Sequence, residues 1–459
     1  ADNTAVGRDA LANNTTASDN TAVGSGSLDA NTTGGYNTAV GKTALGANTT
    51  ASHNTAMGYN ALGSNTTGIR NIAIGNYCLD ANTTANDNIA VGYAALSGAV
   101  TGTNNTAIGN EALTANTSGA SNTGLGRYAL YQNSTGSYNT AIGNNAMYSS
   151  TTADGNTAVG NAALMLNTTG TANVAVGHNA LDANTTAHYN TALGYQALSA
   201  NTTGEGNTAV GRNALVANTT GAENVAIGRD ALTANTTGNS NVAVGRAALT
   251  ANTTAAMNTA VGTEAGEALT TGAANTLVGY KAGTACTGDG NTAIGKDALE
   301  SCTTGQNTAV GSNALAAVTT GTYNTAVGSD ALTACTGENN TALGAYTLDA
   351  NTSGNSNTGL GVQALTTNTT GGENIAIGRK ALEVNTTGDN NVAVGNYALD
   401  ANTTADNNTA IGYAALGANT TGDLNTAIGV NALSAATTAD RNVAVGKDAL
   451  AAYSADGDT

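Results

Sequence analysis

Hydrophobic and polar residues recur along this chain with a period of 17 residues. From Asn3 to Asp458 there are 27 units, each of which begins with Asn and carries Gly at its fifth position. Three units, beginning at Asn275, Asn291 and Asn324, are one residue shorter. A repeat that fills the chain predicts stacked copies of one small unit, none of which can bury its hydrophobic residues alone.

Within the unit, numbered 1 to 17 from its Asn, the hydrophobic positions are few and regular. Position 4 is aliphatic in every unit, position 9 is Leu or Met in 25, and position 3 is Ala in 24. Position 2 is Thr in 19 units and Val or Ile in 8. β-Branched residues favour strands, whereas Gly and the Asn-Thr-Thr-Gly-like run break helices and favour turns. The pattern predicts an all-β fold, a parallel β-solenoid of about 27 coils with two short strands per coil.

Alternation along the first strand places positions 2 and 4 on one face and position 3 on the other. We expect positions 2 and 4 to face the interior, together with Leu at position 9. Position 3 then faces outward, yet it is nearly always Ala, so a surface must pack closely against it. Either the solenoid's own chain covers this face or, as we favour, another subunit does. The candidate intersubunit face comprises Ala5, Ala22, Ala39, Ala73, Ala175 and Ala226.

Position 12 is Asn within an Asn-[Thr/Ser]-[Thr/Ser] run in 18 units. This run is formally an N-glycosylation sequon. The residues that replace this Asn are mostly apolar or small, such as Leu269 and Val318, which indicates an inward position. We therefore expect a ladder in which each side-chain amide bonds its neighbours in the coils above and below; glycosylation is the alternative. The ladder is expected to include Asn31, Asn48, Asn65, Asn82, Asn201, Asn218 and Asn235.

Two segments, residues 71–75 (Asn-Ile-Ala-Ile-Gly) and 173–177 (Asn-Val-Ala-Val-Gly), resemble the head repeats of trimeric autotransporter adhesins, which read Ser-Val-Ala-Ile-Gly. Similar Asn-Thr-Ala-x-Gly arrays occur in tail-fibre and surface-fibre proteins of phages and bacteria. The resemblance covers all 27 units, although the period of 17 is longer than that of the adhesin heads. It implies a left-handed β-roll, three chains around a common axis, and a fibre that binds a surface receptor or glycan.

Composition narrows the function further. The chain has 13 Lys and Arg against 30 Asp and Glu, a net charge of −17, which argues against nucleic-acid binding. It contains no apolar run of about 18 residues, so we expect no membrane insertion. His53, His178 and His188 lie in distant coils, and no carboxylate pair recurs in a way that suggests acid–base catalysis. We expect neither an enzyme nor a bound cofactor or metal.

Residues 263–339 depart from the pattern within an otherwise single continuous solenoid over 1–459. Here the units shorten, and Gly266 and Gly283 replace the Leu of position 9. Cys286 and Cys302 occupy position 12 of adjacent units, about 5 Å apart if the coils stack, which makes a disulfide between them possible. The segment is expected to be a bend, a change of packing or a softened stretch.

The repeat pattern and composition predict a non-enzymatic, elongated solenoid. The resemblance implies that it is an extracellular structural and adhesive fibre, homotrimeric and displayed on a cell or virion. One alternative is a self-assembling extracellular filament whose units stack head to tail through exposed strand edges. Another is an ice-binding solenoid in which the Thr columns of positions 13 and 14 form a flat face. The 16 Tyr lie almost entirely at variable positions, where they either mark binding surfaces or serve as β-formers on a solvated edge.

Overall fold

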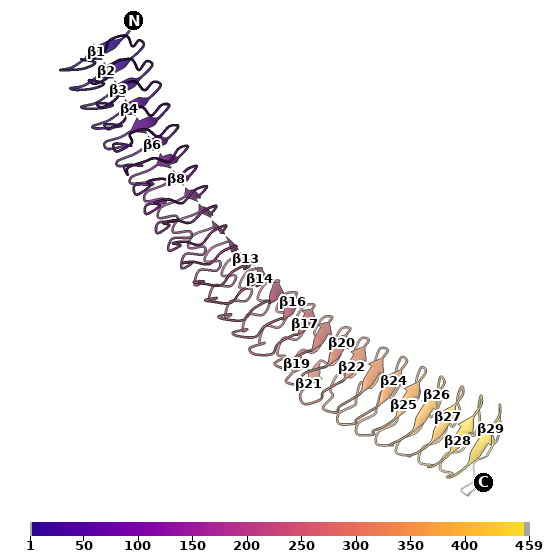
Figure 1. The fold of residues 1–459 in the computed structure, drawn as a ribbon. Helices are drawn as coiled ribbons and strands as arrows, with labels where there is room; N and C mark the ends of the chain where they lie inside the picture. The colour runs from indigo at the N-terminus through magenta and orange to yellow at the C-terminus, as the bar shows by residue number, and fades with distance from the viewer. Residues whose placement is uncertain (1, 454–459) are drawn as a thin grey trace. The chain divides into compact units, whose positions relative to one another are not determined.

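The computed structural model describes residues 2–453, and the contacts within it divide the chain into two units, Ala1–Arg229 and Asp230–Thr459. Each unit is a parallel β-solenoid in which successive coils stack on one another (Figure 1). The described residues contain no helix. The predicted fold class is therefore confirmed. The left-handed sense of the coil and the continuity of a single solenoid over residues 1–459 remain predictions.

Each coil contributes one three-residue strand, formed by positions 2 to 4. In unit 1 the strands are β1 (Thr4–Val6), β2 (Thr21–Val23), β3 (Thr38–Val40), β4 (Thr55–Met57), β5 (Ile72–Ile74), β6 (Ile89–Val91), β7 (Thr106–Ile108), β8 (Thr123–Leu125), β9 (Thr140–Ile142), β10 (Thr157–Val159), β11 (Val174–Val176), β12 (Thr191–Leu193), β13 (Thr208–Val210) and β14 (Val225–Ile227).

Unit 2 repeats the same arrangement. Its strands are β15 (Val242–Val244), β16 (Thr259–Val261), β17 (Thr276–Val278), β18 (Thr292–Ile294), β19 (Ser301–Cys302), β20 (Thr308–Val310), β21 (Ala317–Val318), β22 (Thr325–Val327), β23 (Thr341–Leu343), β24 (Thr358–Leu360), β25 (Ile375–Ile377), β26 (Val392–Val394), β27 (Thr409–Ile411), β28 (Thr426–Ile428) and β29 (Val443–Val445).

The second strand that we predicted for each coil is wrong for almost the whole described chain. The only further strands in residues 2–453 are β19 and β21, which lie at positions 11 and 12 of their coils and pair with each other. Elsewhere the residues around position 9 form turns rather than a strand. The pairing of the position 2–4 strands is parallel and in register, so that Thr21 lies opposite Thr38 and Ala22 opposite Ala39. Identical side chains of successive coils therefore stack in columns.

The face of the strand that points into the coil is the opposite of the one we predicted. Ala at position 3 is fully buried, as Ala39 and Ala209 illustrate, whereas positions 2 and 4 are partly or fully exposed. Leu at position 9 lies inside, as predicted. The residues of position 3 and the Leu residues of position 9 face each other across this interior. For example, a Cβ on Gly124 at position 3 would lie 3.4 Å from Leu113 Cδ1. The interior is so narrow that a methyl group is all that fits opposite Leu, which explains the near-invariant Ala.

Left-handed backbone conformations make the tight turns of each coil. Position 7 and position 17 have φ near +60°, as in Asn60 (φ 56°) and Asp19 (φ 63°), and Asn and Asp tolerate this region better than most residues. Leu at position 9 adopts it as well, for example Leu45 at φ 52°. The Gly of position 5 has φ of 128–142°, and a Cβ on Gly160 would lie 2.4 Å from Gly177 O. Only glycine fits there.

Residues 263–339 keep the stacked coil but change its packing. Gly266 and Gly283, which replace Leu at position 9, have φ of 62° and 60°, the conformation of the Leu they replace. The space is filled by Leu277, which stands where other coils have Ala at position 3. A Cβ on Gly283 would lie 2.6 Å from Leu277 Cδ2, and one on Gly266 would lie 2.8 Å from Leu277 Cδ1. One large residue thus compensates for the loss of two.

We expect Gly160→Ala to lower the stability far more than Gly155→Ala. Both glycines have positive φ, but a Cβ on Gly155 meets nothing within 4 Å, whereas a Cβ on Gly160 meets backbone of the next coil. The backbone cost alone is about 1–2 kcal/mol, and the clash at Gly160 adds about 1–3 kcal/mol. Urea denaturation followed by circular dichroism measures both. Equal midpoints for the two variants would show that the position-5 glycine is replaceable.

We expect Leu277→Ala to be destabilising by about 2–5 kcal/mol, because it empties the space between two glycines. Gly283→Leu alone is also destabilising, because the new side chain collides with Leu277. The double variant restores the sequence of an ordinary coil and should be more stable than either single variant. A double-mutant cycle from denaturation midpoints measures this coupling, and simple additivity of the two losses would contradict the compensation.

Candidate interaction surface

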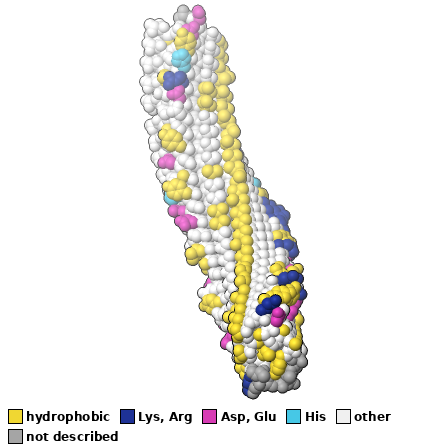
Figure 2. Space-filling model, turned by 90° about the vertical axis from the view of Figure 1, so that its right-hand side faces the viewer, with side chains coloured by type: hydrophobic (Ala, Val, Ile, Leu, Met, Phe, Trp, Pro, Cys, Tyr) yellow, Lys and Arg dark blue, Asp and Glu magenta, His cyan; other side chains and the backbone are white. Residues whose placement is uncertain are grey.

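Exposed aliphatic side chains of position 4 form a column along each unit. Their side chains stack in register, and many are about 40% exposed, such as Met57 at 42% and Leu193 at 46% in unit 1 and Leu343 at 44% in unit 2. Figure 2 shows hydrophobic side chains in a column along the surface of stacked coils. Leaving this column in contact with water is unfavourable, because burial of apolar surface stabilises a protein by about 25 cal/mol for each Å².

A second column, of position 2, runs beside the first. It consists of Thr in most coils and of Val or Ile in the rest, among them Ile72 and Val174, which are 37% and 38% exposed. No residue at positions 2, 3 or 4 of any coil is charged. The outward face of the strands is therefore a flat, uncharged strip, which we call the outward strip (positions 2 and 4).

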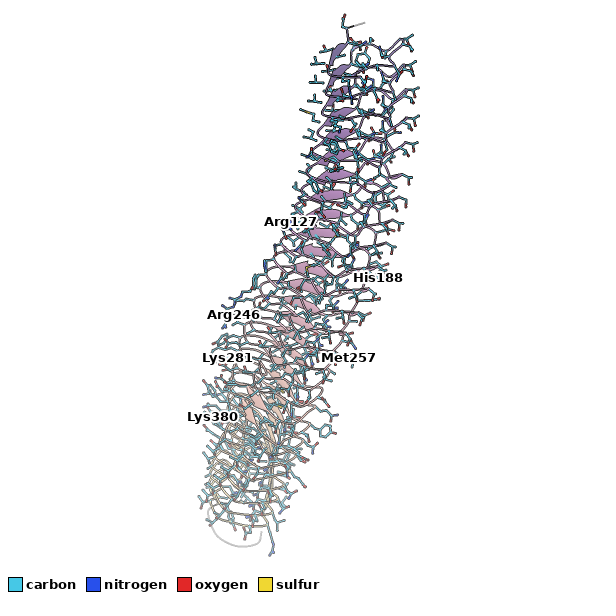
Figure 3. All side chains as sticks on the ribbon, turned by 90° about the vertical axis from the view of Figure 1, so that its left-hand side faces the viewer. Arg127, His188, Arg246, Met257, Lys281 and Lys380 are labelled. Atoms are coloured by element: carbon cyan, nitrogen blue, oxygen red, sulfur yellow. The ribbon has the colours of Figure 1, made fainter. Side chains whose placement is uncertain are left out.

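Charged side chains lie at the turns on either side of the coil. Eleven of the 13 Lys and Arg are at positions 6 and 7. In unit 1, Arg127 and His188 lie at opposite edges, and in unit 2 Arg246, Lys281 and Lys380 lie opposite Met257 (Figure 3). Charge is thus confined to the two edges of each unit and leaves the outward strip neutral.

The predicted intersubunit face of Ala residues is wrong. Ala22, Ala39, Ala73, Ala175 and Ala226 are all 0% exposed within the single chain. Ala5 is exposed, since the described residues include no coil before its own. The alternative, that the solenoid's own chain covers this face, is the one the structure shows. The near-invariant Ala of position 3 therefore reflects a narrow interior. The surface that is available to another molecule is the opposite face of the same strand.

The predicted ladder of Asn at position 12 is confirmed. Asn48 Nδ2 donates to Asn31 Oδ1 (3.0 Å), Asn65 Nδ2 to Asn48 Oδ1 (3.1 Å) and Asn82 Nδ2 to Asn65 Oδ1 (2.8 Å). The same contact joins Asn201 and Asn218 (2.9 Å). The Asn side chains of this ladder are fully buried from Asn31 onward, and Asn235 accepts from Asn252. Glycosylation, the alternative, would require these buried amides to reach solvent.

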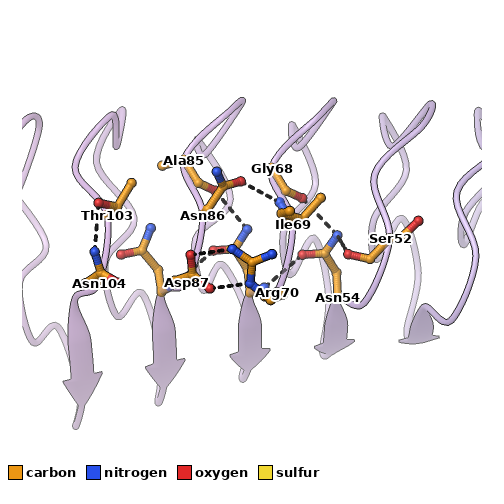
Figure 4. A network of polar contacts seen from close by, with 12 residues as sticks. Ser52, Asn54, Gly68, Ile69, Arg70, Ala85, Asn86, Asp87, Thr103 and Asn104 are labelled. Carbon is orange, nitrogen blue, oxygen red and sulfur yellow. Dashed lines mark hydrogen bonds and ion pairs between the residues drawn. The ribbon is translucent and has the colours of Figure 1, made fainter.

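A second Asn ladder, at position 1, was missed by the sequence reasoning. The backbone N–H of Asn71 donates to Asn54 Oδ1 (2.9 Å), while Asn54 Nδ2 donates to Gly68 O (2.9 Å; Figure 4). Asn65 of the first ladder donates to the same carbonyl (3.0 Å). Both amides of a coil therefore meet at its position-15 carbonyl. The invariant Asn at position 1 was the signal that could have revealed this ladder.

Threonine hydroxyls of position 13 form a third set of contacts between coils. Thr32 Oγ1 donates to Thr49 O (3.0 Å), and Thr66 Oγ1 donates to Thr83 O (3.0 Å). These hydroxyls already have protein partners. The ice-binding alternative, which placed its flat face at positions 13 and 14, loses half of that face.

Interruptions of the position-12 ladder leave buried acceptors without a hydrogen-bond partner. Asn82 Oδ1 and Asn133 Oδ1 have none, and the next position-12 residues are Ala99 and Ser150. The Ser150 hydroxyl is likewise buried and unpaired. A buried acceptor without a donor costs about 1–3 kcal/mol.

We expect Ser150→Asn to raise the stability by about 1 kcal/mol, because its amide can donate to Asn133 Oδ1 and rejoin the ladder. The matched control is Asn184→Ser, which breaks an intact part of the ladder where Asn184 Nδ2 donates to Asn167 Oδ1 (2.8 Å). It should be destabilising by a similar amount or more. Thermal unfolding midpoints compare the two, and a destabilised Ser150→Asn variant would show that the ladder adds no stability at this coil.

The disulfide that the sequence made possible between Cys286 and Cys302 is absent, and all four cysteines are free, buried thiols. In stacked coils two equivalent side chains point the same way, whereas a disulfide needs a Cβ–S–S–Cβ angle near 90°. Cys302 instead donates to Thr304 O (2.9 Å). The contact with Cys302 and burial raise the pKa of the Cys286 thiol, whereas the same contact lowers the pKa of the Cys302 thiol to about 7.

Other chemistry is sparse in the part of the chain that the structure describes. No group of three or more His, Cys, Asp and Glu lies close enough to hold a metal ion within residues 2–453. His53 and His178 stack on Tyr36 and Tyr195, and the backbone N–H of Thr171 donates to His188 Nδ1 (3.0 Å). Over these residues there is also no apolar helix of membrane-spanning length.

No protein-family model matches the chain, and no curated protein matches it. The class that the fold defines is a parallel β-solenoid repeat protein with an uncharged outward strip on each unit.

Proposed function

We propose that this chain is a non-enzymatic structural and adhesive fibre that assembles with copies of itself through the outward strip. One observation carries the proposal: every coil places an aliphatic residue at position 4, and these residues are partly or fully exposed rather than buried. Unit 1 alone has 14 such strands in register. Contiguous apolar patches of more than a few hundred Å² are unusual on monomers and mark interaction sites.

A second copy of the chain is the partner that best fits this strip. Its aliphatic column has the same spacing per coil, so the contact of one coil repeats at the next along the whole unit. The strip carries no charge, so two copies meet without repulsion, whereas the charged turns remain at the edges in water. The resemblance to trimeric adhesin heads favours three chains around a common axis, with the strips facing that axis.

The same resemblance supports an extracellular location, on a cell or a virion. The architecture supports a mechanical role, because the strand hydrogen bonds run from coil to coil along the stack. Separating coils would therefore require several ladders to break together: the strand bonds, two sets of Asn amides and the Thr hydroxyls. In this role the fibre holds a binding surface away from its base.

Light scattering of the native protein tests the assembly. We expect a mass near three times the 44.5 kDa of one chain. A variant with Lys at five successive position-4 residues should have the mass of one chain, because the strip can no longer be buried. These residues are Ile142, Val159, Val176, Leu193 and Val210.

The matched control places Lys at position 6 of the same coils, on the charged edge, and should keep the native mass. Its substituted residues are Asn144, Asn161, His178, Tyr195 and Arg212. Circular dichroism confirms that both variants are folded. A wild-type mass near 44.5 kDa would overturn self-association through this strip.

A second candidate function, ice binding, gains one specific observation. The Thr column of position 2, expected inside, faces outward beside a regular aliphatic column. A flat strip of Thr and aliphatic side chains could order water at a fixed spacing. Measurement of thermal hysteresis at high protein concentration decides between the two, because a self-associated strip is covered and should give none.

A further inference from the structure

Three successive coils of unit 1 carry large side chains where other coils have small ones. Position 10 is mostly Asp, Thr, Ser or Gly elsewhere, and position 11 is mostly Ala. In these coils the two positions hold Tyr131 and Gln132, then Tyr148 and Ser149, then Met165 and Leu166. Stacking brings these residues together although they are 17 positions apart in the chain. We call this cluster, with Tyr128, the aromatic patch.

The rings of the aromatic patch are held in a fixed arrangement. Tyr131 and Tyr148 are stacked, with centroids 5.0 Å apart and planes within 9°. Tyr128 meets both edge-on, at 5.3 and 6.0 Å. The Arg127 guanidinium lies 4.4 Å from the centre of the Tyr128 ring and donates to its hydroxyl (3.0 Å), at the edge of unit 1 labelled in Figure 3. Rings that are fixed before binding lose little entropy on binding.

A cavity of about 250 Å³ adjoins this stack. Its walls are Asn145, Tyr148, Ser149, Met165 and Leu166, and Leu166 is 43% exposed at its mouth. The volume is slightly below the range of about 300–1,000 Å³ for sites that hold a drug-sized ligand. The cavity is therefore suited to one ring-sized group rather than to a large ligand.

We infer that this cavity binds one neutral pyranose ring of a glycan, with the sugar packed against Tyr148. A pyranose has a face of C–H groups, which suits the electron-rich face of an aromatic ring, and hydroxyls at its rim. Asn145 supplies a donor and an acceptor, and Ser149 supplies a hydroxyl. None of the five lining residues is charged, so a phosphate or another anion would find no positively charged partner. A purely lipidic group would leave the Asn145 amide and the Ser149 hydroxyl without partners.

This inference rests on the proposed function, because it names the class of ligand that the adhesive fibre would bind. It does not depend on assembly for its chemistry. The aromatic patch uses positions 7, 10 and 11, so the outward strip stays free for self-association. Failure of either proposal can therefore be recognised separately.

Saturation-transfer NMR with the methyl glycosides of glucose, galactose, mannose and N-acetylglucosamine tests the site on the full chain. We expect transfer to the C–H protons of at least one of them. Tyr148→Ala should weaken its binding about tenfold or more, the equivalent of one lost stacking contact, whereas Tyr148→Phe keeps the ring and should bind within about threefold of the wild type. The control, Tyr397→Ala, removes a surface tyrosine of another aromatic pair and should change nothing.

If Tyr148→Ala fails to fold by circular dichroism, Leu166→Glu takes its place, because Leu166 is exposed at the cavity mouth and its replacement leaves the interior intact. Transfer to none of the four glycosides at tens of millimolar, or equal binding by the wild type and Leu166→Glu, overturns the inference. The five-Lys variant of the outward strip separates the two proposals, because sugar binding should persist in it even when its mass is that of one chain.

Discussion

In-register stacking of near-identical coils is the constraint on which the rest of this structure depends. Because each residue lies beside its equivalent in the next coil, every side chain must be compatible with copies of itself. Asn satisfies this condition inside the coil, since its amide can donate to one neighbour and accept from the other. The two Asn ladders and the position-13 hydroxyls exploit it, and a thin solenoid can in this way have a polar interior whose groups are paired.

The narrow interior decides what is left outside. Leu at position 9 fills the coil from one side, and only a methyl group fits opposite it at position 3. The β-branched and aliphatic residues of the same strand must then point outward. An uncharged strip on each unit is the direct consequence, and it is the feature that any account of the protein's function must explain. Self-association explains it by covering the strip with the same periodic surface.

Departures from the repeat are informative because the repeat itself is so regular. Leu277 between Gly266 and Gly283 is a packing exchange that conserves interior volume, and it changes no exposed surface chemistry. Tyr131, Tyr148 and Leu166 are the opposite case. These side chains are large at positions where other coils have small ones. Tyr148 and Leu166 line a cavity, Tyr131 stacks on Tyr148, and nothing in the packing of the coil requires any of the three.

The sequence by itself determined the period, the all-β solenoid, the inward Leu of position 9 and the Asn ladder, because each follows from residue type and spacing alone. It did not determine which face of the strand is inside. Alternation separates position 3 from positions 2 and 4, but an invariant Ala is equally consistent with a tight core and with a tight interface. Only the tertiary structure decided this, by closing the coil so narrowly that Leu and Ala fill it. The stacked structure also decided the arrangement of the tyrosine rings in the aromatic patch and the state of Cys286 and Cys302, which touch as free thiols.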